Sequence, residues 1–191
     1  VDQQNNIYVG AIGDNEFYTW HFIRKYDANG NLTWSKIYNG GTCSMHQADL
    51  AIDSKGNVYF LSTVENLFLG GRLMKHDSEG NLAWDKMHNT GLQAFPADIA
   101  IDSADNIFVT GSNLNYEQNF VEYYLLQYNG KGEQQFVSTI SVGYSTRAHG
   151  MALSNNNIFI TGYARFDTGF DFYTINYKLL YKAKGTLSSK S

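Results

Sequence analysis

The feature that most constrains the fold of this chain is a segment that recurs about every 50 residues. Its copies read VDQQNNIYV at 1–9, IDSKGNVYF at 52–60, IDSADNIFV at 101–109 and LSNNNIFI at 153–160. A second segment reads KYDANGNLTW at 25–34, KHDSEGNLAW at 75–84 and QYNGKGEQQF at 127–136, and its fourth copy survives as TINYK at 174–178. A fixed period of this length is typical of proteins built by stacking one supersecondary unit.

Each repeat predicts four β-strands. In the second repeat the strands are expected at 49–53, 57–62, 71–77 and 81–88, where residues suited to strands are bounded by turns rich in Gly, Asn and Ser. Short hairpin turns need positive φ angles, which Gly adopts without penalty and Asn tolerates. Since no stretch shows a sustained helical period, we expect an all-β fold.

A four-stranded repeat of about 50 residues predicts a blade of a β-propeller. The expected repeat units are residues 1–49, 50–98, 99–150 and 151–178, followed at 179–191 by an atypical tail or an incomplete final strand. Large rings recur at equivalent positions and are expected to pack between blades, each burial contributing roughly 2 to 3 kcal/mol. These rings are Trp34, Trp84 and Phe136.

The repeated segments resemble the bacterial propeller repeats of the SBBP type. The resemblance covers residues 1 to about 178 and rests on IDSADNIFVTG at 101–111, DFYTINYK at 171–178 and NGNLTWSKIYNGG at 29–41. The second repeat departs from the pattern at Leu61 and Ser62, which replace Thr-Gly, and at Gly70 and Gly71, which replace an acidic-aromatic strand start. The resemblance implies a propeller in a secreted or cell-surface setting, and it carries no catalytic residues.

The chain holds about three and a half to four blades, whereas propellers usually have about four to eight. We therefore expect it to be part of a larger propeller. A minimal four-bladed ring and a half-ring completed by a second copy are the alternatives. An uncovered blade would expose an apolar face and an unpaired strand edge, which favour association.

Composition and charge exclude several classes of partner. The formal net charge of −4 leaves no basic excess to neutralise phosphates, so we expect no nucleic acid partner. The single cysteine, Cys43, excludes a disulfide framework within one chain and a multi-cysteine metal site. No apolar run approaches the roughly 18 residues that span a bilayer, so we expect no membrane span.

Binding groups are expected in the loops, because the strands are occupied by packing. Between the second and third strands of the repeats we expect loops that contain Tyr18, Trp20, Tyr116, Arg165, Phe166 and Asp167. Between repeats we expect loops that contain His46, Phe95, Tyr144, Arg147 and His149. In a propeller the two sets open on the same face, around the mouth of the central channel.

Aromatic rings beside hydrogen-bonding groups suit a sugar ring or the side chains of a partner protein. The sequence therefore predicts a noncatalytic binding or scaffold propeller with a glycan or protein ligand. The alternative for each loop ring is that it folds back to cap a blade edge. The ligand-binding candidates are Tyr18, Trp20, His46, Phe95, Tyr116, Arg147, His149 and Phe166.

Sequence motifs for metal or cofactor binding are lacking. The chain has no HExxH motif, no closely spaced His pair and no Gly-rich phosphate loop, so neither a metal nor a cofactor is expected. Alternating Asp and Asn at 27–31 could supply calcium ligands, as could Asp, Glu and Asn at 77–81. A misplaced Gly instead favours hydrogen bonds within the turn.

The alternative function is a propeller lyase or hydrolase with its site at the mouth of the channel. His46, Arg147 and His149 would supply its ionisable groups, together with Asp49 and Asp98 at the start of equivalent strands. For the two aspartates the expected role is to accept backbone N–H bonds that hold a loop to a strand.

Overall fold

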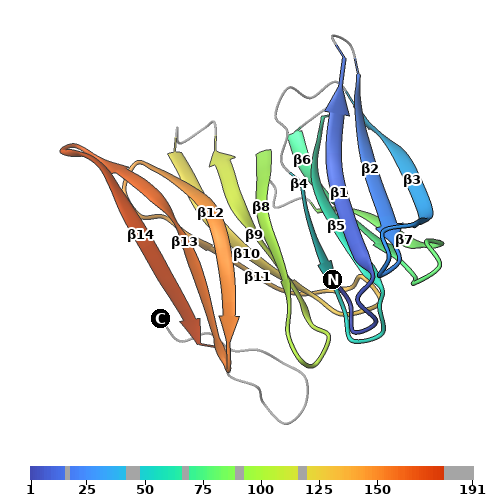
Figure 1. The fold of residues 1–191 in the computed structure, drawn as a ribbon. Coiled ribbons are helices and arrows are strands. Elements are labelled where there is room, and N and C mark those ends of the chain that lie inside the picture. The colour runs from blue at the N-terminus through green and yellow to red at the C-terminus, as the bar shows by residue number, and fades with distance from the viewer. Residues whose placement is uncertain (16–17, 42–47, 66–68, 89–92, 116–119, 179–191) are drawn as a thin grey trace. The chain divides into compact units, whose positions relative to one another are not determined.

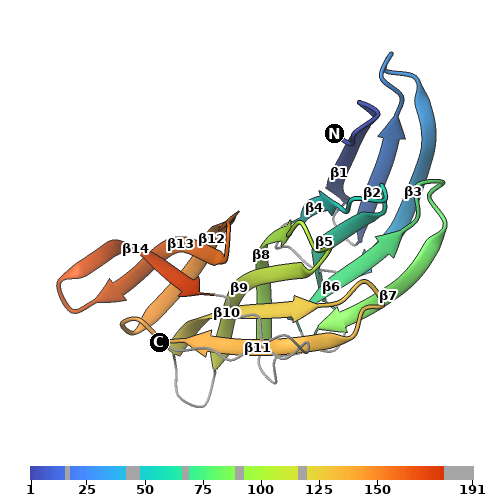
Figure 2. The ribbon, with the colours of Figure 1, turned by 90° about the horizontal axis from the view of Figure 1, so that it is seen from below.

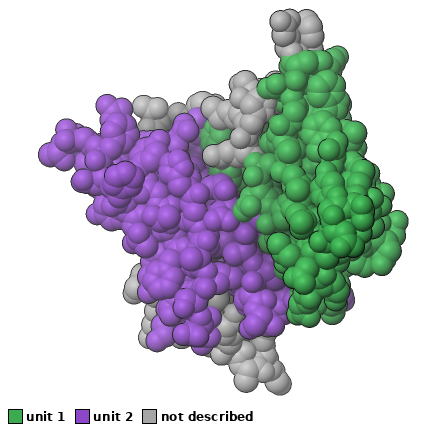
Figure 3. Space-filling view, in the orientation of Figure 1, with its two compact units in different colours: residues 1–96 green, residues 97–191 purple. Residues whose placement is uncertain are grey.

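The structure is a computed structural model that describes residues 1–15, 18–41, 48–65, 69–88, 93–115 and 120–178. Fourteen strands lie in these residues. Within the same residues there is no helix with the length and apolarity that crossing a membrane requires. The chain divides into two compact units, residues 1–96 and 97–191 (Figure 3).

The first unit contains two antiparallel sheets whose strands follow one another along the chain (Figure 1). The first sheet consists of β1 (Ile7–Asp14), β2 (Thr19–Tyr26) and β3 (Leu32–Gly41). The second sheet consists of β4 (Ala48–Ile52), β5 (Val58–Glu65), β6 (Leu69–His76) and β7 (Leu82–His88). A single parallel residue pair, Gly41 with Glu65, joins the two sheets.

The second unit repeats this arrangement (Figure 2). One sheet consists of β8 (Gln93–Ile101), which crosses the boundary between the units, β9 (Ile107–Asn115), β10 (Phe120–Tyr128) and β11 (Gln134–Ile140). The next consists of β12 (Ser145–Ser154), β13 (Asn157–Phe166) and β14 (Gly169–Lys178). These sequential antiparallel sheets confirm the all-β fold of blade-like repeats that the sequence predicts.

Apolar side chains from adjacent sheets form the core of each unit. In the first unit the buried core consists of Tyr8, Ile23, Val58, Phe60 and Met74, from β1, β2, β5 and β6. In the second unit it consists of Phe108, Tyr123, Leu125, Ala148, Ile158 and Ile160, from β9, β10, β12 and β13. Trp34 packs against the first core and Phe136 against the second, which confirms the expected packing of these two rings between sheets.

Turns that begin with an aspartate join neighbouring strands. Asp53 Oδ1 accepts the backbone N–H groups of Lys55 at 3.0 Å and Asn57 at 2.9 Å, while Oδ2 accepts the Asn57 side-chain amide at 2.7 Å. The same three bonds form at Asp27 and Asp77. Such local bonds are the ordinary role of Asp and Asn in turns, so the expected turn hydrogen bonds are present at 27–31 and 77–81.

Several residues expected in loops lie in strands. Trp20 belongs to β2 and Phe95 to β8, whereas Arg147 and His149 belong to β12. Strand β12 begins early because residues 145–148 pair with 162–165 of β13. Arg165 and Phe166 likewise form the last two residues of β13 (Asn157–Phe166). For these six residues the predicted loop placement is therefore wrong.

Candidate functional site

Two connections of the second unit are joined by hydrogen bonds. One precedes β12 at residues 141–144, and the other joins β13 to β14 at 167–168. The Tyr144 backbone N–H donates to the Arg165 carbonyl oxygen at 2.9 Å, and the Tyr144 O–H donates to Asp167 Oδ2 at 3.0 Å across 23 sequence positions. The connection between the third and fourth repeats thus contacts the connection between the second and third strands of the fourth repeat. The sequence predicts that these two kinds of loop open on the same face.

Gly143 allows these connections to approach closely. Its φ angle is 77°, a conformation that residues with a side chain rarely adopt. A Cβ at this position would collide with the Arg165 carbonyl oxygen and lie 3.1 Å from the ring of Phe166. Glycine therefore lets the loop lie against β13 while the Phe166 ring keeps its position.

A hollow of about 430 Å³ opens at this junction. It is lined by Leu114, Val121, Tyr144, Ser145, Arg165, Phe166 and Asp167. A second hollow of about 510 Å³ shares Tyr144, Phe166 and Asp167 with the first. Ligand pockets of this size combine apolar and aromatic walls with a few polar groups that orient the ligand, and the lining has this composition.

Further aromatic rings extend from the hollow over the sheet β12–β14. The Arg165 guanidinium lies over the Phe170 ring, with 5.7 Å to its centroid. Phe170 meets Tyr163 edge to face at 5.5 Å, and Tyr163 lies 5.4 Å from the ring of His149. Since Arg147 pairs with Tyr163 in register, the candidates Arg147, His149 and Phe166 all lie in this one sheet.

The remaining candidates lie elsewhere in the sequence. Tyr18 is 54% exposed just before β2, and Trp20 in β2 is half-buried. Phe95 is half-buried in β8, within residues 1–96. His46 and Tyr116 lie outside the described residues. Of the predicted set, the described residues therefore bring together only Arg147, His149 and Phe166 around one hollow and its sheet.

Of the residues that line the hollow, only Phe166 belongs to the eight predicted candidates. Three of the others are expected in the same loops as the candidates: Tyr144, Arg165 and Asp167. The hydrogen bond between Tyr144 and Asp167 depends on the pairing of β12 with β13, which local patterns do not specify. Arg165 and Asp167 flank the candidate Phe166 in the sequence, and this position is a signal that could identify them.

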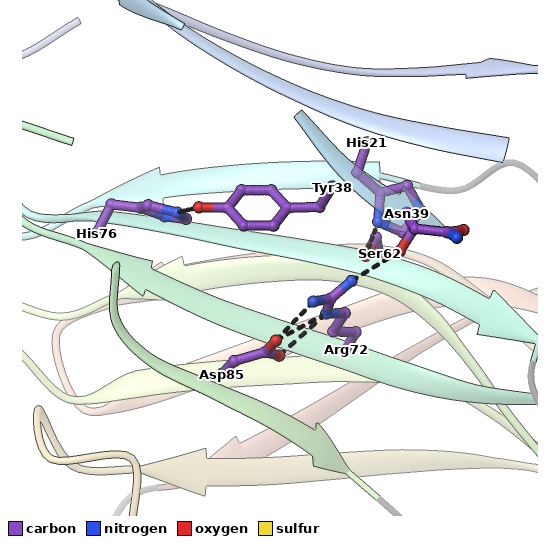
Figure 4. Close-up of polar contacts among 7 residues, drawn as sticks. All are labelled: His21, Tyr38, Asn39, Ser62, Arg72, His76 and Asp85. Atoms are coloured by element: carbon purple, nitrogen blue, oxygen red, sulfur yellow. Dashed lines mark hydrogen bonds and ion pairs between the residues drawn. The ribbon is translucent and has the colours of Figure 1, made fainter. Parts of the chain in front are cut away.

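The first unit holds a polar network that the sequence did not indicate (Figure 4). The Tyr38 hydroxyl lies 2.6 Å from His76 Nε2, and the Ser62 hydroxyl lies 3.1 Å from His21 Nδ1. Burial lowers the pKa of His76 to about 4, so this ring is neutral at pH 7. His76 occupies the repeat position of Tyr26, which is consistent with a packing role.

Arg72 links three strands beside this network (Figure 4). Its guanidinium binds both carboxylate oxygens of Asp85 in β7, the shortest contact being 2.6 Å, and donates to the Asn39 carbonyl of β3 at 2.9 Å. The same group lies 5.6 Å from the centre of the Tyr38 ring. The cation therefore holds the two sheets of the first unit together.

Asp49 and Asp98 accept backbone N–H bonds, which is one part of the role that the sequence predicts for them, but both bonds join strand residues and do not hold a loop. Asp49 Oδ1 accepts the N–H of Leu50 at 2.8 Å, and Asp98 Oδ2 accepts the N–H of Met151. Within the described ranges, no group of three or more His, Cys, Asp and Glu side chains is placed to hold a metal ion.

No protein-family model matches this sequence, and no curated protein matches it significantly. A GH43 β-1,3-galactosidase resembles the structure with a TM-score of 0.48 and 11% identity, over 98% of this chain and 46% of the galactosidase. A variant of the Synechocystis apocarotenoid oxygenase matches with a TM-score of 0.49 and 10% identity, over 97% of this chain and 46% of the oxygenase.

An α-L-arabinofuranosidase from Clostridium thermocellum matches with a TM-score of 0.44 and 13% identity, over 96% of this chain and 71% of the arabinofuranosidase. The galactosidase and the oxygenase are β-propeller proteins. The chain spans about half the length of each. These likenesses concern the fold alone and transfer no activity to this chain.

Proposed function

We propose that the chain is part of a noncatalytic, glycan-binding propeller in a secreted or cell-surface bacterial protein, built from repeats of the SBBP type. The observation that carries the proposal is the hollow bordered by Tyr144, Phe166 and Asp167. Two segments joined to each other by hydrogen bonds present these groups at one end of the sheet β12–β14. Further blades, from a longer chain or from a second copy, complete the ring in this proposal.

A sugar ring matches the chemistry of this hollow. The C–H face of a pyranose packs on an aromatic ring such as Phe166. The Asp167 carboxylate accepts hydrogen bonds from sugar hydroxyls, and the Arg165 guanidinium donates to them. A partner protein is the other predicted ligand class, but a stable protein contact covers about 800 Å² of each partner, and a small hollow favours the sugar.

A lyase or hydrolase is the second candidate. Such an enzyme needs an acid or base within hydrogen-bond reach of the proton it transfers. Asp49 and Asp98 are engaged with backbone N–H groups, which favours the noncatalytic alternative. His46, which the enzymatic alternative also requires, lies outside the described residues.

The binding proposal is tested by applying the chain to an array of immobilised glycans and titrating the retained glycans by calorimetry. Phe166→Ala should weaken binding by roughly tenfold, because it removes the stacking ring. Asp167→Asn keeps the shape but removes the charge, and it should also weaken binding. Tyr18→Ala removes an exposed ring of the first unit and should bind like the unmodified chain.

Two results would contradict glycan binding at this site. One is that the array retains no glycan, and the other is that Phe166→Ala leaves the affinity unchanged. Cleavage of a retained glycan, detected by chromatography, would favour the enzyme. For the proposed setting, antibodies against the chain should label intact source cells, and labelling only after lysis would count against a surface or secreted protein.

A further inference from the structure

One face of the sheet β12–β14 is open to solvent. Phe172 is 94% exposed and Phe170 is 65% exposed, and both point to the side on which Tyr163 lies, because Tyr163 is the register partner of Phe172. We call these three rings the trailing face. The opposite face of the same sheet carries Ile158 and Ile160, which are buried in the core of the second unit.

The repeat shows how the equivalent face is used in two of the other sheets. Alignment of KYD at 25–27 and QYN at 127–129 with NYK at 176–178 places Phe172 level with His21 and Tyr123. Both of these residues are fully buried. His21 hydrogen-bonds to Ser62 of the following sheet, and the Tyr123 O–H donates to the Tyr163 carbonyl of the sheet that follows it. The position of Phe172 is therefore one that packs on a following sheet.

A second exposed face lies on β1, and its residues align with positions that pack on a preceding sheet instead of a following one. Ile7 and Val9 are 41% and 44% exposed, and we call this pair the leading face. In the repeat they align with Val58 and Phe60 of β5, as well as with Ile158 and Ile160 of β13. Those four residues are buried in cores shared with the preceding sheet. Ile7 and Val9 therefore occupy positions that pack on a preceding sheet.

We infer that the trailing face of one copy docks on the leading face of a second copy. The contact continues between chains the sheet packing that already exists within each unit. Contiguous exposed apolar residues mark association sites, and two unlike faces produce a head-to-tail contact. This inference does not depend on glycan binding, because neither face includes Tyr144, Phe166 or Asp167.

The experiment measures the molar mass of the full chain by light scattering over a range of concentrations. The unmodified chain should associate, and Phe172→Asp and Val9→Asp should each raise the dissociation constant by roughly tenfold or more. Tyr18→Asp, at a similarly exposed site outside both faces, is the matched control and should associate normally. Circular dichroism should show unchanged folding, since the altered side chains are wholly or partly exposed.

Mixing the two variants tests the head-to-tail arrangement. Phe172→Asp keeps an intact leading face, and Val9→Asp keeps an intact trailing face. In an equimolar mixture the intact trailing face of a Val9→Asp chain can bind the intact leading face of a Phe172→Asp chain, so association should recover. An unmodified chain that stays monomeric would overturn the inference. It would also be overturned if Val9→Asp associated normally, because the trailing face would then pair with itself.

Discussion

At the scale of single residues, the aspartate at the start of a turn accepts several hydrogen bonds at once. Asp53 accepts two backbone N–H bonds and the Asn57 amide, and its Oδ2 also accepts the Tyr59 O–H at 3.1 Å. Asp53 is only 9% exposed. The side chain therefore satisfies donors that water does not easily reach.

We predict that Asp53→Ala lowers the free energy of unfolding by about 2 to 3 kcal/mol, because it leaves buried donors without an acceptor. Asp77→Ala removes the same turn bonds at an exposed position and should have a smaller effect. Urea denaturation of the two variants measures the difference. Equal losses would contradict the importance of burial.

Gly143 has a similar importance for the hollow. Gly143→Ala should destabilise the chain by about 1 to 2 kcal/mol and weaken glycan binding, because the new Cβ collides with the Arg165 carbonyl and crowds Phe166. Gly30→Ala is the control, since its φ is also positive but no atom lies within 4 Å of the added Cβ. If both variants bind glycan equally well, the close approach at Gly143 does not shape the site.

At the scale of strands, buried histidines make the stability of the first unit depend on pH. The His88 ring lies where a Cβ on Gly71 would be, and burial lowers the pKa of His88 from 6.5 to about 4. Between pH 6.5 and about pH 4, the His88 ring therefore binds a proton in the unfolded chain but not in the folded chain. Stability is complete above pH 6.5 and declines as the pH falls toward 4.

The predicted decline is up to about 1.4 kcal/mol per pH unit for His88, and His76 contributes in the same direction because burial also lowers its pKa. Urea midpoints measured at pH 7.5 and pH 5 should fall accordingly. His88→Gln should show a shallower fall over the same interval. A midpoint that does not change between these pH values would rule out a neutral buried His88.

The positions of strands and turns could be predicted from the sequence because their signals are local. The strand expected at 57–62 corresponds to β5 at Val58–Glu65, and the one expected at 81–88 to β7 at Leu82–His88. The early start of β12 could not be predicted, since it depends on pairing with β13. Gly71 departs from the repeat pattern, and the structure gives the reason: the His88 ring occupies the space that a side chain at position 71 would need.

The candidate site was predictable in part for the same reason. Phe166 is the last residue of β13, in a segment rich in aromatic and charged residues, and that composition is a local signal. The partnership of Tyr144 with Asp167 spans 23 positions and exists only after two strands have paired. The sequence therefore indicates which loops to consider, and the register of the strands decides which side chains meet.

At the scale of the whole molecule, binding and association use different parts of one sheet. The hollow lies at the strand ends and the connections that join them, whereas the trailing face consists of Tyr163, Phe170 and Phe172 on β13 and β14. Phe172→Asp should therefore reduce association and leave glycan affinity unchanged, while Phe166→Ala should do the reverse. Calorimetry and light scattering on both variants measure this separation, and loss of both properties in either variant would contradict it.

We propose that a sugar binds where the connection before β12 meets the connection between β13 and β14. The most direct test is an NMR titration of the ¹⁵N-labelled chain with a glycan that the array retains. We predict that the perturbed amides cluster at residues 143–145 and 165–168 and that the remaining strands are unaffected. Perturbations centred on other connections, or on the open faces of β1 and β14, would contradict the account.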